Sequence, residues 1–176
     1  MKPFITERLI LRELSVNDAY YFYLLNEDTE VLQYTGDIPF ENLEAAKQFL
    51  AEYDQYKRYG LGRWAVIRKD DNAFLGWCGL KYSSDKNEYD IGFRFFRHYW
   101  NMGYATEAAK KCIEVGFNKF RIPIIIGRVM KNNSSSIRVL EKIGLTRTKD
   151  YDFDGHEGYI YLIKRSLKPN QPVQHQ

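Results

Sequence analysis

The chain has 176 residues, a length that fits one domain with a sizeable hydrophobic core. Its formal net charge of +3 is small and dispersed, so the composition does not indicate a nucleic-acid partner. No apolar run approaches the roughly 18 residues that a membrane span needs, and the N-terminus lacks the apolar stretch of a signal peptide. We therefore expect no membrane partner and a cytoplasmic location.

The cysteines and histidines do not indicate a metal site. Cys78 and Cys112 are far apart in the sequence and lack metal-ligand spacing. None of His98, His156 and His175 pairs with a cysteine or an acid at such spacing. We expect no bound metal and a buried, reduced cysteine pair.

The N-terminal third predicts one strand and two helices. Residues 4–12 alternate between apolar and polar, which predicts a strand. Ser15, with Asp18 three residues on, is typical of an N-cap and predicts a helix over about 16–26. Apolar residues at helical spacing predict a longer helix over about 41–58.

The middle of the chain predicts an antiparallel meander that leads into a parallel crossover. Strands are expected at about 63–68, 73–82 and 88–96, joined by short polar turns. A helix over about 103–118 has one apolar face, and the almost wholly apolar run 122–130 predicts a strand covered on both faces. The last two strands should be parallel, because a helix connects them.

The C-terminal part predicts a helix over about 135–143 that ends at Gly144. Two strands follow at about 145–151 and 157–166. The whole pattern predicts a single α/β domain over residues 1–168, with a mixed, mostly antiparallel sheet of about six or seven strands flanked by helices. The polar, proline-bearing tail 169–176 is expected to be disordered.

Two motifs carry the functional information. The first, Trp100-Asn101-Met102-Gly103-Tyr104-Ala105-Thr106-Glu107-Ala108, follows a strand and opens a helix. A glycine-bearing turn at a helix N-terminus presents free N–H groups at the positive end of the helix dipole, which is an arrangement that binds phosphate. The second, Asn133-Ser134-Ser135-Ser136-Ile137-Arg138-Val139-Leu140-Glu141-Lys142-Ile143-Gly144-Leu145, lies about thirty residues on.

Together the motifs resemble the GNAT superfamily of acetyl-CoA-dependent N-acetyltransferases, and within it the RimJ/RimL branch, which acetylates the α-amine of ribosomal proteins. That branch has Glu-Ile-Gly-Tyr on the strand, then Trp-Gly-Lys-Gly-Tyr-Ala-Thr-Glu-Ala, and later Asn-x-x-Ser-Ile-Arg-Val-Leu-Glu-Lys-Leu-Gly-Phe. The opening Thr6-Glu7-Arg8-Leu9-Ile10-Leu11-Arg12 is also similar, so the resemblance runs from about residue 6 to about residue 166. Three departures stand out: Asp90 replaces glutamate, Asn101-Met102 replaces Gly-Lys, and Trp100 stands where the wider superfamily often has Gln or Arg.

The resemblance implies a GNAT-like fold and acetyl-CoA as the cofactor. The backbone of residues 93–95 should pair with the pantetheine arm like an added strand, and the turn over residues 101–106 should hold the pyrophosphate. Asn133 should bind pantetheine or shape its own loop. Trp100 is equally well interpreted as core or as a wall of the site. For the 3′-phosphate, Arg97, His98 and Arg138 are candidates, although solvated surface is their simpler interpretation. The expected cofactor-binding residues are Phe93, Arg94, Phe95, Trp100, Asn101, Met102, Gly103, Tyr104, Ala105, Thr106, Asn133 and Ser136.

Two residues are candidates for catalysis. Asp90 matches the family glutamate and would act as a base through a water, because it is one methylene shorter. Its alternative is an ordinary solvated acid on a strand. Ser136 matches the serine that some relatives use near the coenzyme sulfur, as an acid or to orient the thiol. Its alternative is a helix cap.

The function implied is transfer of an acetyl group to a primary amine, foremost a protein N-terminal α-amine, by direct attack on the thioester. A small amine (polyamine, aminoglycoside or amino acid) is a second possibility, because the acidic stretch Glu27, Asp28 and Glu30 could attract a polycation, although such runs are usually solvated. A third is a non-catalytic acyl-CoA-binding module. The protein is expected to be a monomer or a homodimer.

Overall fold

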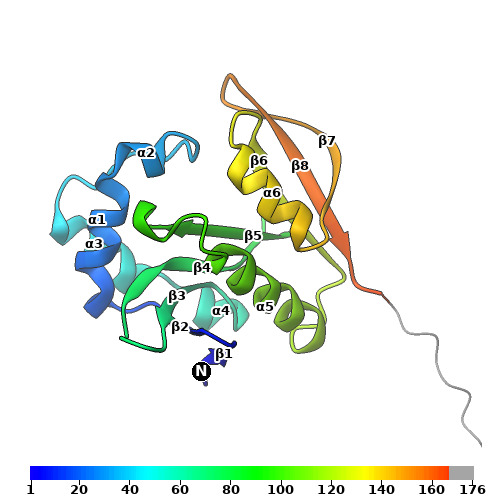
Figure 1. Ribbon diagram of the computed structural model, residues 1–176. Coiled ribbons are helices and arrows are strands. Elements are labelled where there is room, and N and C mark those ends of the chain that lie inside the picture. Colours follow the sequence, from blue (N-terminus) through cyan, green and yellow to red (C-terminus); the bar gives the residue numbers. More distant parts are fainter. Residues whose placement is uncertain (167–176) are drawn as a thin grey trace, which may run out of the picture.

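The structure is a computed structural model that describes residues 1–166. One sheet of eight strands runs through it, in the order β1-β2-β3-β4-β5-β6-β8-β7 (Figure 1). All neighbouring strands are antiparallel except β5 and β6. The strands are β1 Phe4–Ile5, β2 Leu9–Glu13, β3 Arg63–Arg68, β4 Phe74–Ser83, β5 Glu88–Phe95, β6 Ile124–Met130, β7 Thr146–Phe153 and β8 His156–Lys164. The predicted tail 169–176 lies outside the described residues.

The α/β class and the mixed sheet are confirmed, but the number of strands is eight rather than six or seven. The extra strand arises because the run 4–12 divides into β1 and β2. A tight turn interrupts it, in which the Thr6 N–H donates to the Leu9 carbonyl at 3.0 Å. The Lys69 ammonium holds this turn through the Glu7 carbonyl at 3.0 Å.

Helices cover both faces of the sheet. They are α1 Ala19–Glu27, α2 Thr29–Leu32, α3 Leu43–Glu52, α4 Gln55–Tyr59, α5 Tyr104–Asn118 and α6 Ser134–Lys142, with short 3₁₀ turns η1 Val16–Asp18 and η2 Arg97–Tyr99. Neighbouring β3 residues show the two faces: Trp64 and Val66 pack in the core beneath α5, whereas Ala65 packs in a second core with α1 and α3. Successive side chains of a strand point to opposite faces of the sheet, so one strand contributes residues to both cores.

Two predicted helices are divided in the structure. Ser15 is the N-cap, and its N–H donates to the Asp18 carboxylate at 2.9 Å, but the first turn is η1 and only then does α1 begin. The helix expected over 41–58 breaks between α3 and α4, because Tyr53 has extended backbone dihedrals. Its hydroxyl accepts the Arg63 N–H at 2.8 Å, so a tertiary contact overrides local helical propensity there.

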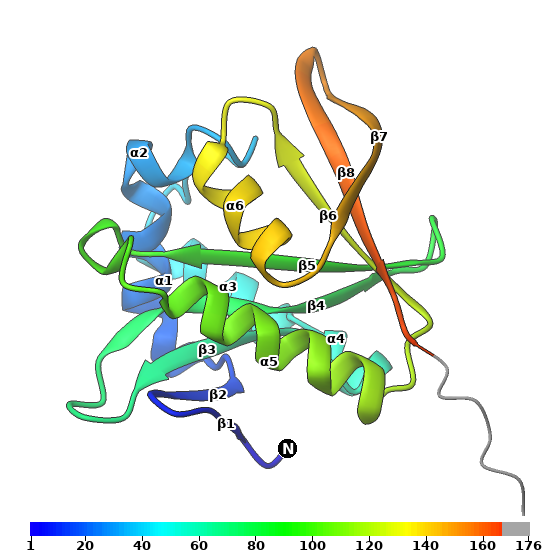
Figure 2. The ribbon, with the colours of Figure 1, turned by 45° about the vertical axis from the view of Figure 1, so that its right-hand side comes forward.

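The strands β5 and β6 separate soon after they meet. They form the predicted parallel pair, linked by α5, but their register contains a single Cα pair, Asp90 with Ile126. Beyond it the two strands diverge, and α6 lies beside the gap (Figure 2). The C-terminal half of β5 therefore keeps β4 on one edge and has no neighbouring strand on the other, within the described chain.

The cysteines pack against each other between β4 and α5, with Cys78 Sγ and Cys112 Sγ 3.6 Å apart and both free. Burial raises the pKa of the Cys112 thiol. Within residues 1–166, no helix is long and apolar enough to cross a membrane, and no group of three His, Cys, Asp or Glu side chains could hold a metal ion.

Candidate active site

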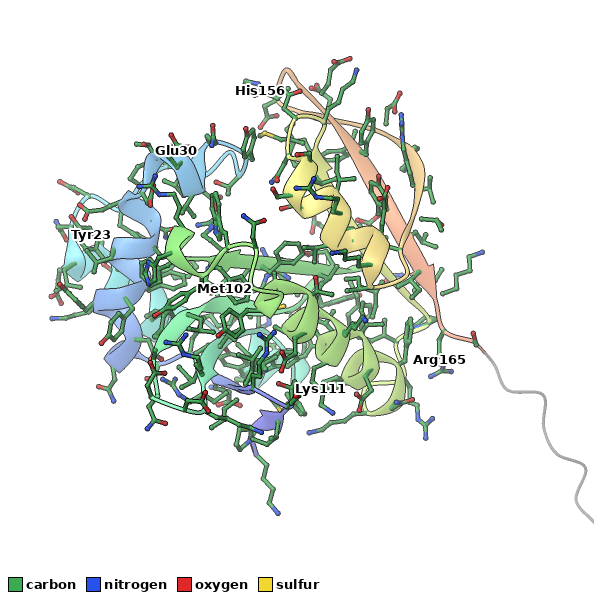
Figure 3. The ribbon with its side chains drawn as sticks, in the orientation of Figure 1. Tyr23, Glu30, Met102, Lys111, His156 and Arg165 are labelled. Atoms are coloured by element: carbon green, nitrogen blue, oxygen red, sulfur yellow. The ribbon has the colours of Figure 1, made fainter. Side chains whose placement is uncertain are left out.

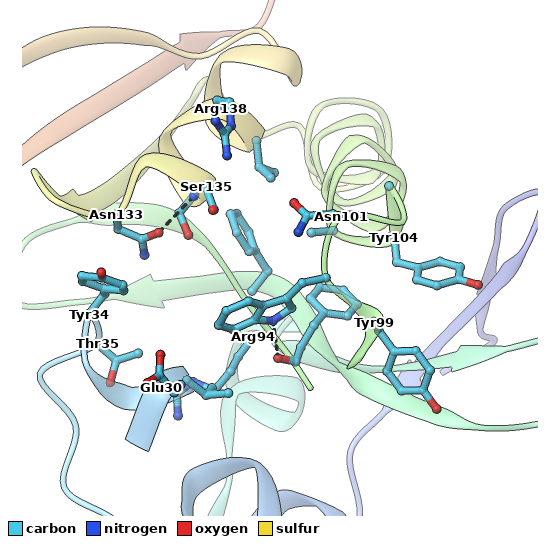
Figure 4. Close-up of a pocket in the computed structure, with 18 of the residues that line it drawn as sticks. Glu30, Tyr34, Thr35, Arg94, Tyr99, Asn101, Tyr104, Asn133, Ser135 and Arg138 are labelled. Atoms are coloured by element: carbon cyan, nitrogen blue, oxygen red, sulfur yellow. Dashed lines mark hydrogen bonds between the residues drawn. The ribbon is translucent and has the colours of Figure 1, made fainter. Parts of the chain in front are cut away.

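A pocket of about 310 Å³ lies where β5 loses its neighbour (Figure 4). Four segments form it: α2 and the loop after it, the end of β5, the turn into α5, and α6. The lining residues are Glu30, Val31, Tyr34, Thr35, Phe93, Arg94, Phe95, Tyr99, Trp100, Asn101, Gly103, Tyr104, Ala105, Asn133, Ser135, Ser136, Arg138, Val139 and Lys142. The pocket lining thus includes most of the predicted cofactor residues, with Met102 and Thr106 as the exceptions, and of the two catalytic candidates it includes Ser136 but not Asp90.

The open edge of β5 presents peptide groups to this pocket. The Phe96 N–H donates to the Leu75 carbonyl of β4 at 3.1 Å. Because peptide groups alternate in direction along a strand, Arg94 also directs its backbone to β4, whereas Phe93 and Phe95 direct theirs to the open edge. There the Phe95 carbonyl accepts the Trp100 indole N–H at 2.8 Å. Phe93 is therefore the residue whose N–H and C=O are best placed to pair with an extended ligand.

The side chain of Arg94 shapes the floor of the pocket. It is buried, and its guanidinium bonds to the Asn26 side chain on α1 and the Asp37 carboxylate in the loop after α2. It also lies 5.3 Å from the ring centroid of Trp77. These contacts tie β5 to the α1–α2 wall, so Arg94 serves the pocket by fixing this wall.

The turn into α5 has the geometry of an anion site. Asn101 and Gly103 have positive φ angles of 61° and 81°, which turn the chain sharply before the 15-residue helix. The N–H groups of Tyr104, Ala105 and Thr106 begin the helix, and within residues 1–166 they have no hydrogen-bond acceptor. Such groups, together with the helix dipole, attract phosphate.

Two predicted residues of this region contribute no side chain to the pocket. Met102 is 51% exposed and lies at the surface (Figure 3), and Thr106 is half-buried and is not part of the pocket lining. Trp100 lines the pocket and is 40% exposed, so of its two interpretations the wall fits and the core does not.

The second motif separates the roles of Asn133 and Ser136. The Asn133 carboxamide accepts the Ser136 N–H at 3.1 Å, so Asn133 is the N-cap of α6 (Figure 4). Ser136 is not the cap; it lines the pocket, and in the described part of the chain its hydroxyl has no hydrogen-bond partner. The side chain is thus free to bond a ligand atom.

Two cations on α6, neither of them ion-paired within residues 1–166, line the pocket. Arg138 and Lys142 stand one helical turn apart, and neither forms an ion pair with another described residue. The other candidates for the 3′-phosphate lie outside the pocket, since Arg97 pairs with Asp28 at 2.7 Å and His98 stacks on Phe96. Lys142 was not identified from the sequence as a candidate for the 3′-phosphate. Its position four residues after Arg138 on a predicted helix could have indicated that both cations share one face.

Asp90 is engaged elsewhere. Its carboxylate pairs with the Arg63 guanidinium, and both side chains are largely buried, at 16% and 17% exposed. Arg63 also donates to the Gly79 carbonyl at 2.6 Å and the Asp90 carbonyl at 3.1 Å. Burial opposes the charge of Arg63, but the Asp90 carboxylate outweighs it and raises the pKa of Arg63. The structure therefore joins Asp90 to β3 and does not bring it into the pocket lining.

The comparisons with known proteins agree with this geometry. Residues 8–146 match the family described as the acetyltransferase (GNAT) domain. The chain belongs to the GNAT family. It is 32% identical to YkkB of Bacillus subtilis over 148 residues, which cover 82% of this chain and 86% of the relative. It is 28% identical to p20 of Bacillus licheniformis, named as an N-acetyltransferase, with 86% and 88% covered.

A GNAT-family acetyltransferase from Bacillus anthracis has the same fold, with a TM-score of 0.80 and 27% identity over 93% of this chain and 98% of that one. The protein is therefore an acetyl-CoA-dependent N-acetyltransferase. The pocket fits this GNAT cofactor in three respects: an open strand edge at Phe93, N–H groups at the start of α5, and cations at Arg138 and Lys142. Within residues 1–166 these N–H groups have no acceptor and these cations have no ion-pair partner. Acetyl-CoA supplies the thioester whose acyl carbon the amine attacks.

Proposed function

We propose that this GNAT enzyme acetylates the α-amine of a protein N-terminus, which enters the pocket beside α2. The observation that carries the proposal is the state of Asp90, the acid matching the family base: its carboxylate is paired with Arg63. A carboxylate that is already bonded to a guanidinium and lies outside the pocket lining is poorly placed to take a proton from an amine in the pocket. The reaction then depends on the fraction of acceptor that is already neutral.

That fraction favours an α-amine. With pKa values of about 8 for an α-amine and 10.4 for a lysine-type amine, the neutral fraction at pH 7.5 differs by roughly two-hundredfold. An enzyme with little base assistance should therefore prefer the α-amine by a large factor. Asp90 in this proposal has a small part in proton removal.

Within the proposed site, each group has one role. Phe93 pairs with the pantetheine arm, and the turn at Gly103 binds the pyrophosphate. Ser136 donates a hydrogen bond to the coenzyme sulfur as the C–S bond breaks, and the proton that the attacking amine releases neutralises the thiolate or passes to water. A thiol with a pKa of about 8.5 leaves readily, so this modest help and correct positioning are sufficient.

A small cationic amine remains the second candidate, because Glu30 places a carboxylate in the pocket lining. The fold is compatible with both. A ribosomal-protein-S5-alanine acetyltransferase from Vibrio fischeri has a TM-score of 0.80 at 16% identity. A spermidine N-acetyltransferase from Vibrio cholerae, in complex with CoA and spermine, has a TM-score of 0.76 at 15% identity. At such identities the likeness extends to the fold alone.

The test is a thiol-release assay with acetyl-CoA and matched acceptors. One peptide carries a free α-amine and a blocked lysine, and its partner carries the reverse, while spermidine and an aminoglycoside complete the panel. We expect kcat/KM for the free α-amine to exceed the lysine peptide by at least tenfold at pH 7.5. A higher kcat/KM for spermidine, lowered by Glu30→Gln, would replace the proposal with the second candidate.

A further inference from the structure

Three hydrogen bonds tie the N-terminal segment to the first turn of α5, through Glu107. The Thr6 hydroxyl donates to Glu107 Oε1 at 2.6 Å, and the Arg8 N–H donates to the same oxygen at 2.9 Å. Arg8 Nε donates to Glu107 Oε2 at 2.6 Å. Both oxygens of the carboxylate are therefore bonded by residues about a hundred positions earlier in the chain.

Arg8 also contacts the cofactor turn itself. Its Nη1 donates to the Met102 carbonyl at 3.0 Å, and its guanidinium lies 4.3 Å from the ring centroid of Tyr104. A Cβ built on Gly103 would lie 3.3 Å from Arg8 Nη2. Gly103 and Tyr104 line the pocket whereas Thr6, Arg8 and Glu107 do not, so the cluster lies on the outer side of the turn.

The charge of Glu107 affects how strongly the turn attracts a phosphate. A carboxylate in the first helical turn is favourable for the helix, but it lowers the positive potential that an incoming phosphate meets. Burial works against its charge, but the bonds from Thr6 and Arg8 outweigh burial and lower the pKa of Glu107. The carboxylate is therefore ionised at neutral pH, and the Arg8 guanidinium is the cation that balances it.

We propose that Arg8 is a positioning residue for cofactor binding, which holds the Glu107 carboxylate on the outer side of the turn and neutralises it. The N–H groups at the start of α5 then remain available to the phosphates. Met102 carries no charge, so Arg8, which donates to the Met102 carbonyl, supplies a cation in contact with the turn. The inference rests on the proposed location of the cofactor at this turn.

The test measures the Kd of CoA by titration calorimetry, which needs no acceptor. We expect Arg8→Gln to weaken CoA by about tenfold, the size of a partly buried charge effect at a helix terminus. Glu107→Gln leaves the Arg8 guanidinium without its counter-charge and should bind CoA at least as tightly as the wild type does. The double variant Arg8→Gln/Glu107→Gln should bind within about threefold of the wild type, because the charge that Arg8 balanced is gone. Once an acceptor is known, KM for acetyl-CoA should rise in Arg8→Gln with kcat unchanged.

Arg12→Gln is the matched control. Arg12 is exposed to the same 40% as Arg8 and forms a comparable pair, with Asp18 at 2.7 Å, but it lies away from the turn. The variant Arg12→Gln should lower the Tm without changing the Kd of CoA. An unchanged Kd of CoA in Arg8→Gln would overturn the inference. So would a weakened Kd in Arg8→Gln that the added Glu107→Gln change in the double variant does not restore.

Failure of the site itself gives a different result. Ala105→Glu places a carboxylate among the free N–H groups and should abolish CoA binding if the turn is the site. Normal binding by this variant refutes the turn as the cofactor site. If Ala105→Glu loses CoA binding while Arg8→Gln keeps the wild-type Kd, only the role of Arg8 is refuted.

Discussion

Replacing Ser136 and Asn133 one at a time separates catalysis from helix capping. Ser136→Ala removes a hydroxyl that lines the pocket but keeps the backbone N–H that Asn133 caps at 3.1 Å. We therefore expect an unchanged Tm and a turnover lowered by a factor on the order of ten to a hundred, the typical value of acid assistance for a moderate leaving group.

Asn133→Ala should behave differently. It removes the cap, which is worth about 1 kcal/mol, and for a domain of this size that corresponds to a Tm lower by roughly 2–4 °C. Because Asn133 also lines the pocket, KM for acetyl-CoA should rise.

Both variants should be measured on one preparation, with calorimetric melting and steady-state thiol release. A Ser136→Ala protein with full turnover would remove the serine from the chemistry. A Ser136→Ala protein as destabilised as Asn133→Ala would show that the hydroxyl has a structural role that the hydrogen bonds do not reveal.

Asp90→Asn should lower stability by roughly 3–5 kcal/mol, since it leaves the buried Arg63 without its partner, while turnover per folded molecule falls less than tenfold. Chemical unfolding with activity normalised to folded protein checks this, and a large loss of turnover with normal stability would restore Asp90 as the base. Arg138→Gln/Lys142→Gln should weaken CoA more than dephospho-CoA, because both cations line the pocket unpaired; equal weakening in calorimetry would place the 3′-phosphate elsewhere. The pKa of Glu107 is lowered in the folded state from its ordinary value of 4.5, so its contribution is present above pH 4.5 and is lost as pH falls through the folded pKa. Tm should thus fall less steeply below pH 4.5 in Glu107→Gln than in the wild type, and identical curves would contradict the assignment.

The features that could be predicted from the sequence are local ones. The turn into α5 carries its glycine, its polar neighbours and its amphipathic helix in one continuous segment, so periodicity and turn chemistry were enough to locate it. The division of residues 4–12 was missed because the turn at Thr6–Arg8 has neither glycine nor proline. Besides its own bonds between Thr6 and Leu9, this turn is held by Lys69 and Glu107, which are both distant in the sequence.

The ion pairs around the pocket could not be predicted, since each joins residues far apart in the chain. Arg63 and Asp90 are separated by 27 positions, and Arg8 and Glu107 by 99. A single sequence contains no signal for such pairs, so the interpretation of Asp90 as a base rested on its match to the family glutamate and on its place on the strand before the turn. Only the fold shows that the same strand position faces an arginine.

The most direct measurement of the central claim, that the turn at the start of α5 holds the cofactor, is the Kd of CoA for Ala105→Glu by titration calorimetry. Ala51→Glu, the same change on the exposed surface of α3, is the control. We predict no detectable binding by Ala105→Glu and an unchanged Kd for Ala51→Glu. The Tm of Ala105→Glu should change little, because an acid in the first turn suits the dipole of α5, whereas Ala51→Glu places an exposed acid in the last turn of α3 and should lower the free energy of unfolding by at most about 1 kcal/mol. A Kd for Ala105→Glu equal to that of the wild type would contradict the account.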